Sequence, residues 1–181
     1  MEDFYTLECA GLTRELPIIR ISDVLAIASF VLLGDQEMAT AAALALEPLL
    51  PKADVILTAE AKGIPLVQEL SRLRNRKRYI VARKSVKAYM EEPLHLDVKS
   101  ITTSKVQTLV LDGKDKAYIK GKSVLLVDDV ISTGESLIAM EKLVEASEAH
   151  VVGKAAILAE GVASQRDDII FLEALPIFTI D

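Results

Sequence analysis

The chain has 181 residues, of which 51% are hydrophobic and 4% aromatic, enough for one domain with a substantial core and too few for two ordinary domains. Its formal net charge of −6 argues against a nucleic-acid partner, and no apolar run reaches the ~18 residues that a membrane-spanning helix needs. The single cysteine, Cys9, excludes an intramolecular disulfide and fits a reducing compartment, so we expect a cytoplasmic protein.

Residues 1–34 differ in pattern from the remainder of the chain. Residues 16–21 and 25–33 are apolar but lack a helical period, so we expect an irregular or strand-like lid in this part. Asp35 is a suitable N-cap, and the Ala-rich residues 36–46 that follow it predict the first helix.

The first core strand is predicted at residues 54–58, an apolar β-branched run typical of a buried parallel sheet. A tight turn with a glycine and a lysine, residues 59–63, joins this strand to a helix that is predicted to end near Arg74. Any strand-to-helix turn can carry glycine and lysine, so the turn by itself is weak evidence for function.

A second core strand, residues 78–82, is followed by three cations, Arg83, Lys84 and Lys87. In an acidic protein such a cluster is either a solvated run of charges or a site for an anion. Guanidinium and ammonium groups both bind phosphate oxygens, which makes the anion site a specific hypothesis.

Residues 84–121 form a long polar insertion before the next core strand. Residues 96–101 alternate apolar and polar side chains, residues 102–104 are typical of a turn, and residues 106–111 are suited to a returning strand, which together predict a β-hairpin. A polar insertion of this length between core strands is usually functional or disordered. His95 and His150 have no partner at metal-ligand spacing, and we predict no metal role for either.

Residues 123–136 carry the strongest functional signal. An apolar strand delivers two adjacent carboxylates, Asp128 and Asp129, and the polar turn after them begins a helix that is predicted to reach about Ala149. Backbone N–H groups of such a turn bind phosphate, and Gly134 permits the unusual φ that the turn needs. The acids would repel that phosphate, so we expect them to face sugar hydroxyls and a hydrated Mg²⁺.

The C-terminal part predicts the last strands. Residues 150–159 form a core strand that ends at Glu160, and residues 169–175 predict one or two more. Strands joined by helices build a doubly wound, mostly parallel α/β sheet whose ligands bind at the carboxyl ends of the strands. The turns after the first and third strands are therefore expected to meet at one edge of the sheet.

The apolar run, the Asp-Asp pair and the Ser-Thr-Gly-x-Ser turn resemble the phosphoribosyl pyrophosphate (PRPP) loop of type I phosphoribosyltransferases. The resemblance implies that Asp128 and Asp129 are catalytic residues that hold the ribose hydroxyls and reach Mg²⁺ through water. It implies that the turn after them cradles the 5′-phosphate. This phosphate turn comprises Val130, Ile131, Ser132, Thr133, Gly134, Glu135 and Ser136.

In the same family, the turn after the first core strand binds pyrophosphate through backbone N–H groups, and cations after the next strand reach it partly across a dimer interface. The implied pyrophosphate-binding residues are Glu60, Ala61, Lys62, Gly63, Arg83, Lys84 and Lys87. The resemblance further implies the type I phosphoribosyltransferase fold for residues 1–181 as a single domain and homodimer. Residues 1–34 and 160–181 would form a small hood, and residues 84–121 the flexible flap.

The implied reaction is attack of a nucleobase nitrogen on C1 of PRPP, which releases pyrophosphate and yields a nucleoside 5′-monophosphate, as in purine salvage. Ser132 stands where hypoxanthine-guanine enzymes have an acid, which favours the adenine and xanthine branches. Glu160 suits a purine that carries an amino group, so adenine is favoured over xanthine. Ile19, Val130 and Ile131 complete the predicted base pocket.

Two departures from the family keep a second function open. Adenine enzymes have a flap glutamate where this chain has residues 108–111, and xanthine enzymes have a lysine where Gly161 stands here. A PRPP- or nucleotide-sensing regulator with the same fold and little catalysis would tolerate both, although the retained cations favour an enzyme. Outside the family, the acids could be a polar strand exit before a helix cap, or an acidic pocket like that of a response regulator.

Overall fold

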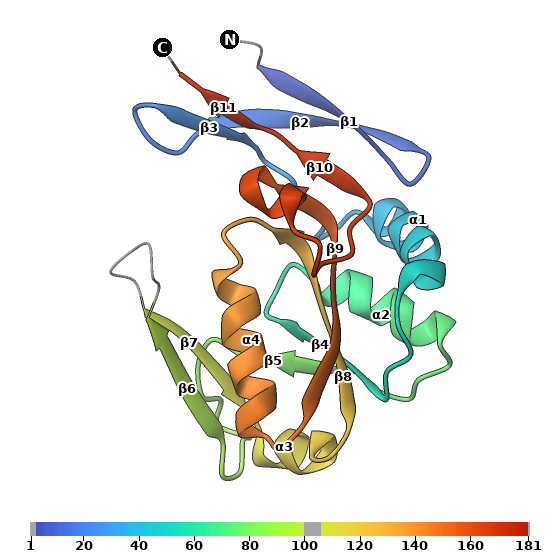
Figure 1. Ribbon diagram of the computed structural model, residues 1–181, viewed down its shortest axis with the longest axis vertical. Helices are drawn as coiled ribbons and strands as arrows, with labels where there is room; N and C mark the ends of the chain where they lie inside the picture. The colour runs from blue at the N-terminus through green and yellow to red at the C-terminus, as the bar shows by residue number, and fades with distance from the viewer. Residues whose placement is uncertain (1–2, 100–105, 181) are drawn as a thin grey trace.

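A computed structural model describes residues 3–99 and 106–180. Its central sheet has five strands in the order β10-β9-β8-β4-β5 (Figure 1), and every pairing in it is parallel. The strands are β4 (Val55–Ala59), β5 (Ile80–Ala82), β8 (Ser123–Ile131), β9 (His150–Glu160) and β10 (Glu173–Leu175). The predicted doubly wound α/β sheet is confirmed.

Helices cover both faces of this sheet (Figure 1). On one face, α1 (Gln36–Leu46) and α2 (Ile64–Leu73) pack in the core that contains Leu125 of β8. On the other face, α4 (Glu135–Ala146) packs in the core that contains Leu126. Both leucines are fully buried, because successive residues of a strand point to opposite faces and both faces are covered.

The helix predicted after Asp35 forms as expected. The Asp35 carboxylate accepts a hydrogen bond of 3.0 Å from the Met38 N–H, and Arg14 pairs with the same carboxylate at 2.7 Å. Several short elements lie outside the predicted set, among them η1 (Glu47–Leu49), α3 (Gly113–Ile119) and η2 (Gly161–Gln165). Elements of this length span two turns or fewer, which is too short for a hydrophobic period to become visible in the sequence.

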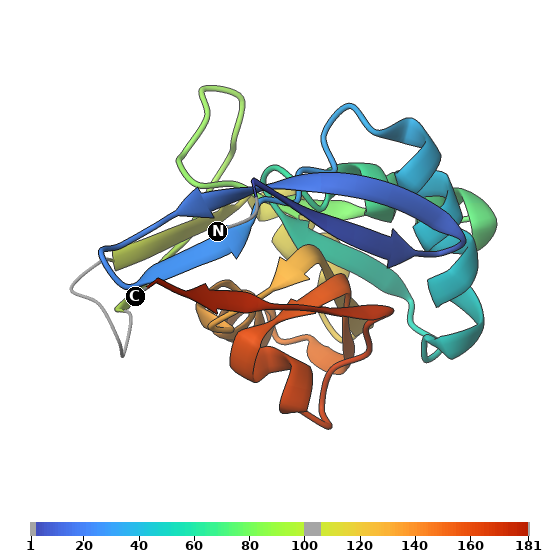
Figure 2. The same cartoon turned by 90° about the horizontal axis from the view of Figure 1, so that it is seen from above.

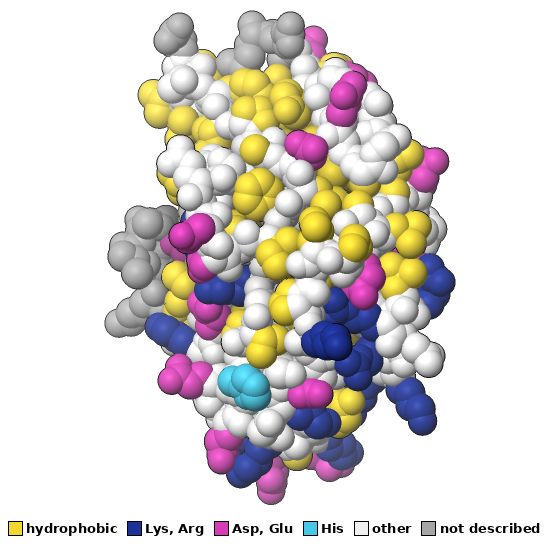
Figure 3. Space-filling model, turned by 45° about the vertical axis from the view of Figure 1, so that its right-hand side comes forward, with side chains coloured by type: hydrophobic (Ala, Val, Ile, Leu, Met, Phe, Trp, Pro, Cys, Tyr) yellow, Lys and Arg dark blue, Asp and Glu magenta, His cyan; other side chains and the backbone are white. Residues whose placement is uncertain are grey.

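A second, antiparallel sheet lies over the carboxyl ends of the central strands, in the order β1-β2-β3-β11 (Figures 1 and 2). It consists of β1 (Phe4–Cys9), β2 (Leu12–Arg20), β3 (Leu25–Ala28) and β11 (Ile177–Thr179). The N-terminal region therefore adopts the strand-like alternative, not the irregular one. Several large hydrophobic side chains of this region stay exposed, such as Ile21 and Val24, and Figure 3 shows hydrophobic atoms over that end of the molecule.

The predicted hairpin is present as β6 (Leu94–Lys99) and β7 (Val106–Leu111), paired with Leu96 opposite Leu109. Its predicted turn lies outside the described residues. Val98, Leu109 and Leu111 are buried in the same core as α4, so the hairpin is docked on that helix. Within the described ranges, no helix combines the length and hydropathy needed to cross a membrane.

Candidate active site

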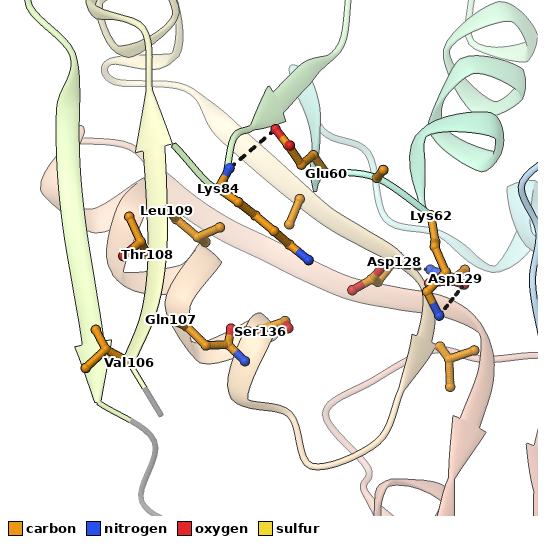
Figure 4. A pocket seen from close by; sticks show the side chains of 13 residues that line it. Glu60, Lys62, Lys84, Val106, Gln107, Thr108, Leu109, Asp128, Asp129 and Ser136 are labelled. Carbon is orange, nitrogen blue, oxygen red and sulfur yellow. Dashed lines mark hydrogen bonds and ion pairs between the residues drawn. The ribbon is translucent and has the colours of Figure 1, made fainter. Parts of the chain in front are cut away.

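A cavity of about 560 Å³ opens where β4 and β8 end (Figure 4). The turn after β4, the end of β8 and the strand β7 line it, and one side chain reaches in from the segment after β5. The lining residues are Ala59, Glu60, Ala61, Lys62, Lys84, Val106, Gln107, Thr108, Leu109, Asp128, Asp129, Val130 and Ser136. The two turns that the sequence placed at one sheet edge therefore meet around one cavity.

The two acids lie within β8, not at its end as predicted. The strand continues beyond them, because Val130 and Ile131 still pair with β9. On the other side, Leu57 pairs with Leu126, which places the last residue of β4 level with Asp128. Both acids therefore line the cavity at the point where β4 ends.

Of the two acids, Asp129 is buried and incompletely satisfied, and Asp128 beside it is half-buried. Asp129 is 3% exposed, and its Oδ2 has no hydrogen-bond partner among the described residues. Lys62 Nζ lies 3.8 Å from that oxygen, an ion pair without a hydrogen bond (Figure 4). Asp128 accepts a 2.9 Å hydrogen bond from the Asp129 N–H. Burial first, and then the charge of Asp129, raise the pKa of Asp128 to about 7. Such a pair calls for a ligand with hydroxyl donors or positive charge.

The turn after β4 approaches Asp128 closely. A Cβ at Gly63 would lie 2.4 Å from the Thr58 hydroxyl oxygen and 3.2 Å from Asp128 Oδ1, so no other residue fits without displacement. Gly63 is also the residue before α2, and its φ of −73° is ordinary. Glycine is therefore required here for space and not for backbone conformation.

Glu60 ties this turn to the segment after β5. Its carboxylate pairs with the Arg83 guanidinium and accepts a 3.3 Å hydrogen bond from the Lys84 N–H. Burial by itself would raise the pKa of Glu60, but these two hydrogen bonds outweigh it and the pKa is lowered. Glu60 thus stays charged and anchors the segment from which Lys84 extends.

The predicted cations separate into two groups. Lys62 and Lys84 line the cavity, and Figure 4 shows the Lys84 side chain pointing into it. Arg83 and Lys87 are described but lie outside the lining: Arg83 is engaged by Glu60 and by the Tyr89 hydroxyl, and Lys87 Nζ donates a 2.7 Å hydrogen bond to a serine hydroxyl. The structure therefore brings together two of the four.

The phosphate turn leaves β8 beside the cavity. Gly134 directly precedes α4 and adopts φ +78°. This is the left-handed conformation that the glycine was expected to permit in the turn. Ser136 lines the cavity and its hydroxyl donates a 3.3 Å hydrogen bond to Gln107 Oε1. Ser132, Thr133 and Glu135 belong to the same turn but are not part of the lining.

The predicted base-pocket residues are less closely grouped. Val130 lines the cavity, whereas Ile131 is 3% exposed and packs in the core beside α4. Ile19 lies in β2 of the second sheet, level with Ile27 and through it with Ile177. Glu160 ends β9 and is 9% exposed. Ile19 and Glu160 lie outside the cavity lining, so their part in base binding stays a prediction.

Sequence reasoning missed one wall of the site and one cation beside it. The wall is residues 106–109 of β7, which the sequence predicted as part of a hairpin without showing the surface on which it docks. The cation is Arg166, whose Nη1 lies 2.7 Å from where a Cβ on Gly134 would stand. Arg166 follows η2, about thirty residues beyond the phosphate turn, and no motif connects the two.

A family model described as a phosphoribosyl transferase domain matches residues 36–177. Among curated relatives, the hypoxanthine/guanine phosphoribosyltransferase of Methanotorris igneus is 44% identical over 87 residues, covering 48% of this chain and 43% of that protein. The xanthine phosphoribosyltransferase of Clostridioides difficile is 29% identical over 100 residues, covering 54% and 51%. The chain thus spans about half the length of these relatives.

Solved structures similar to the chain include two adenine phosphoribosyltransferases. That of Thermoanaerobacter pseudethanolicus has a TM-score of 0.63 at 24% identity and covers 79% of this chain and 84% of its own. That of Leishmania donovani has a TM-score of 0.64 at 18% identity and covers 96% and 76%. At these identities the likeness concerns the fold, which is the type I fold expected from the sequence.

Proposed function

The chain belongs to the phosphoribosyltransferase family, and from this premise we propose that it transfers the 5-phosphoribosyl group of PRPP to a purine base. The observation that carries the proposal is the cavity in which Asp128 and Asp129 face Lys62 and Lys84, with the phosphate turn at its edge. Acids suited to ribose hydroxyls and cations suited to pyrophosphate thus lie around a volume that holds a small ligand.

In the proposed reaction, the lone pair of a base nitrogen forms a bond to C1 of PRPP while the bond from C1 to the pyrophosphate oxygen breaks. The electron pair of that bond leaves with pyrophosphate, and positive charge develops on the ribose. Lys62 and Lys84 would stabilise the departing anion, while Asp128 and Asp129 hold the ribose as it becomes cationic. The β7 wall would exclude water, which could otherwise capture the ribosyl centre.

Mg²⁺ is part of the proposal, and the acid pair fits it. Asp129 Oδ2 is buried without a hydrogen bond among the described residues, and Asp128 lies beside it in the cavity. The described ranges hold no group of three or more His, Cys, Asp or Glu side chains placed for a metal ion. Asp128 and Asp129 would therefore hold the ion through water, with the substrate supplying its other ligands. The ion neutralises charge on the pyrophosphate.

Adenine is the proposed base, favoured over xanthine by the small Ser132 and by the carboxylate of Glu160. The curated relatives are named for hypoxanthine, guanine or xanthine, so these three bases are the competing candidates. The proposed assembly is a homodimer in the cytoplasm, in which Arg83 and Lys87 would contribute to pyrophosphate binding across the interface.

The test is pyrophosphate release from PRPP and Mg²⁺ with adenine, hypoxanthine, guanine, xanthine and uracil offered separately. Turnover with one purine, abolished by Asp129→Asn, is the expected result and would name the base. If the protein turns over none of the five bases but binds PRPP tightly, the proposed function becomes PRPP sensing instead of catalysis. The oligomeric state is checked by light scattering on the eluting protein.

A further inference from the structure

The Arg166 guanidinium lies against the glycine of the phosphate turn. Its Nη1 is 2.7 Å from the position that a Cβ on Gly134 would take, so it occupies the space that any side chain there would need. Gly134 directly precedes α4, where backbone N–H groups and the positive helix end favour an anion. Glycine at this position therefore permits both the positive φ of the turn and the close approach of a cation to it.

A network of ion pairs holds Arg166 in this place. Asp168 accepts hydrogen bonds from Arg166 Nε at 2.8 Å and from Nη2 at 2.7 Å. Lys154 of β9 donates to the same aspartate at 2.7 Å and to Glu141 of α4 at 2.7 Å. The network thus joins the segment after η2 to β9 and to α4. Asp168 engages Nε and Nη2, so Nη1 is the guanidinium nitrogen that this network leaves available to a ligand.

The charges around the turn make such a cation useful. Asp128 and Asp129 line the cavity directly before the phosphate turn, so a phosphate dianion at the turn would lie near negative charge. A guanidinium carries a fixed positive charge and matches the geometry of phosphate oxygens. Asp168 pre-orients it, which lowers the entropy lost when a phosphate binds.

We propose that Arg166 binds the 5′-phosphate of the ribosyl substrate through Nη1, beside the backbone N–H groups of residues 132–136. The inference rests on the proposed function, since it needs a phosphoribosyl ligand in the cavity. The sequence motif places the phosphate subsite wholly within residues 130–136. The proposal adds to it a phosphate-binding side chain from the C-terminal part of the chain, more than thirty residues beyond Asp129.

The experiment measures binding of ribose 5-phosphate by titration calorimetry, which requires no turnover. Arg166→Met keeps an unbranched stem and removes the charge, and Arg166→Lys restores a charge without the planar fork. The matched control is Arg14→Met. Arg14 is likewise held by an aspartate, Asp35, but it lies in β2 of the second sheet and pairs with the cap of α1. Thermal unfolding of each variant checks that it is folded.

We expect Arg166→Met to weaken binding roughly 10- to 100-fold, the range of a lost hydrogen bond to a charged group. Arg166→Lys should recover part of the loss, added salt should shrink the difference, and Arg14→Met should bind like the wild type. Binding by Arg166→Met within about twofold of the wild type, or an equal loss in Arg14→Met, would overturn the proposal.

If Arg166→Met does not fold, Asp168→Asn provides the second test. It keeps the Arg166 charge and weakens its tether, so we expect a smaller loss of affinity, and unchanged affinity would overturn the proposed pre-orientation and binding. A wild-type protein that neither binds ribose 5-phosphate nor releases pyrophosphate would overturn the proposed function itself. A wild-type protein that does both, while Arg166→Met matches it, would overturn the role of Arg166 alone.

Discussion

Replacing Gly63 by alanine tests the contact between the turn after β4 and the acid pair. The new Cβ would stand 2.4 Å from the Thr58 hydroxyl oxygen, and 3.2 Å from both Cα and Oδ1 of Asp128. The backbone at φ −73° accepts alanine without strain, so the whole penalty is steric. Thr58 is fully buried and Asp128 belongs to a central strand, which leaves little freedom to relax.

Overpacking of this kind lowers the free energy of unfolding by about 1–3 kcal/mol. Alanine also reduces the conformational entropy of the unfolded chain, which raises the free energy of unfolding by about 0.4–1 kcal/mol. We therefore expect Gly63→Ala to lower the free energy of unfolding by about 1–2 kcal/mol, measured by urea denaturation. Displacement of Asp128 by a few tenths of an ångström should also slow pyrophosphate release, on the order of tenfold, since misplacements near 1 Å can cost about 100-fold.

A double-mutant cycle with Thr58→Ala separates the clash from other causes. Thr58→Ala removes the hydroxyl oxygen that the new methyl group would contact. The double variant should therefore lose roughly 1 kcal/mol less unfolding free energy than the two single variants lose in sum. Turnover should recover only in part, because the contact with Asp128 remains. Additive free energies, or a Gly63→Ala protein with full stability and turnover, would refute the steric reasoning.

Three further predictions follow from side chains outside this contact. Lys84→Ala should slow turnover more than it weakens nucleotide product binding, because Lys84 points into the cavity, where we propose that it stabilises departing pyrophosphate. Unchanged turnover would contradict this role. Hydrogen bonds from Arg166 and then Lys154 hold the pKa of Asp168 well below its usual range. The Asp168 carboxylate therefore contributes its full stabilisation above the unfolded pKa of about 4, and this contribution is lost as the pH falls below that value. Asp168→Asn should lower the urea midpoint at pH 7 and make the midpoint decline less steeply in acid. Asp35→Ala should destabilise the protein by about 1 kcal/mol through the lost cap of α1, and a change below about 0.3 kcal/mol in urea denaturation would show that the cap is dispensable.

Local features of the sequence were sufficient for most of the central sheet. The mostly apolar β4 is buried over its full length, and the Asp35 cap marks the start of α1. These elements are decided by neighbours in the sequence, since side-chain period and capping act within one or two turns. The phosphate turn is local in the same sense, because a glycine between a strand and a helix accounts for the positive φ of Gly134.

The site required contacts between residues far apart in the chain. Docking of β7 on α4 supplies a cavity wall, whereas the sequence predicted residues 106–111 only as a strand of a hairpin. Ile131, predicted as a wall of the base pocket, packs in the core, because β8 continues past the acids and stays paired with β9. A one-dimensional pattern shows that a residue is apolar but not which surface will cover it.

The amino-acid sequence by itself determined the individual strands of the central sheet, the acid pair and the phosphate turn, because each of these depends on residues within a dozen positions of one another. The tertiary structure decided which cations meet them. It set Lys62 and Lys84 at the cavity, engaged Arg83 with Glu60 outside it, and placed Arg166 against Gly134. Charges act through space and the chain between them does not constrain their distance, so only the folded arrangement selects the ones that can share a ligand.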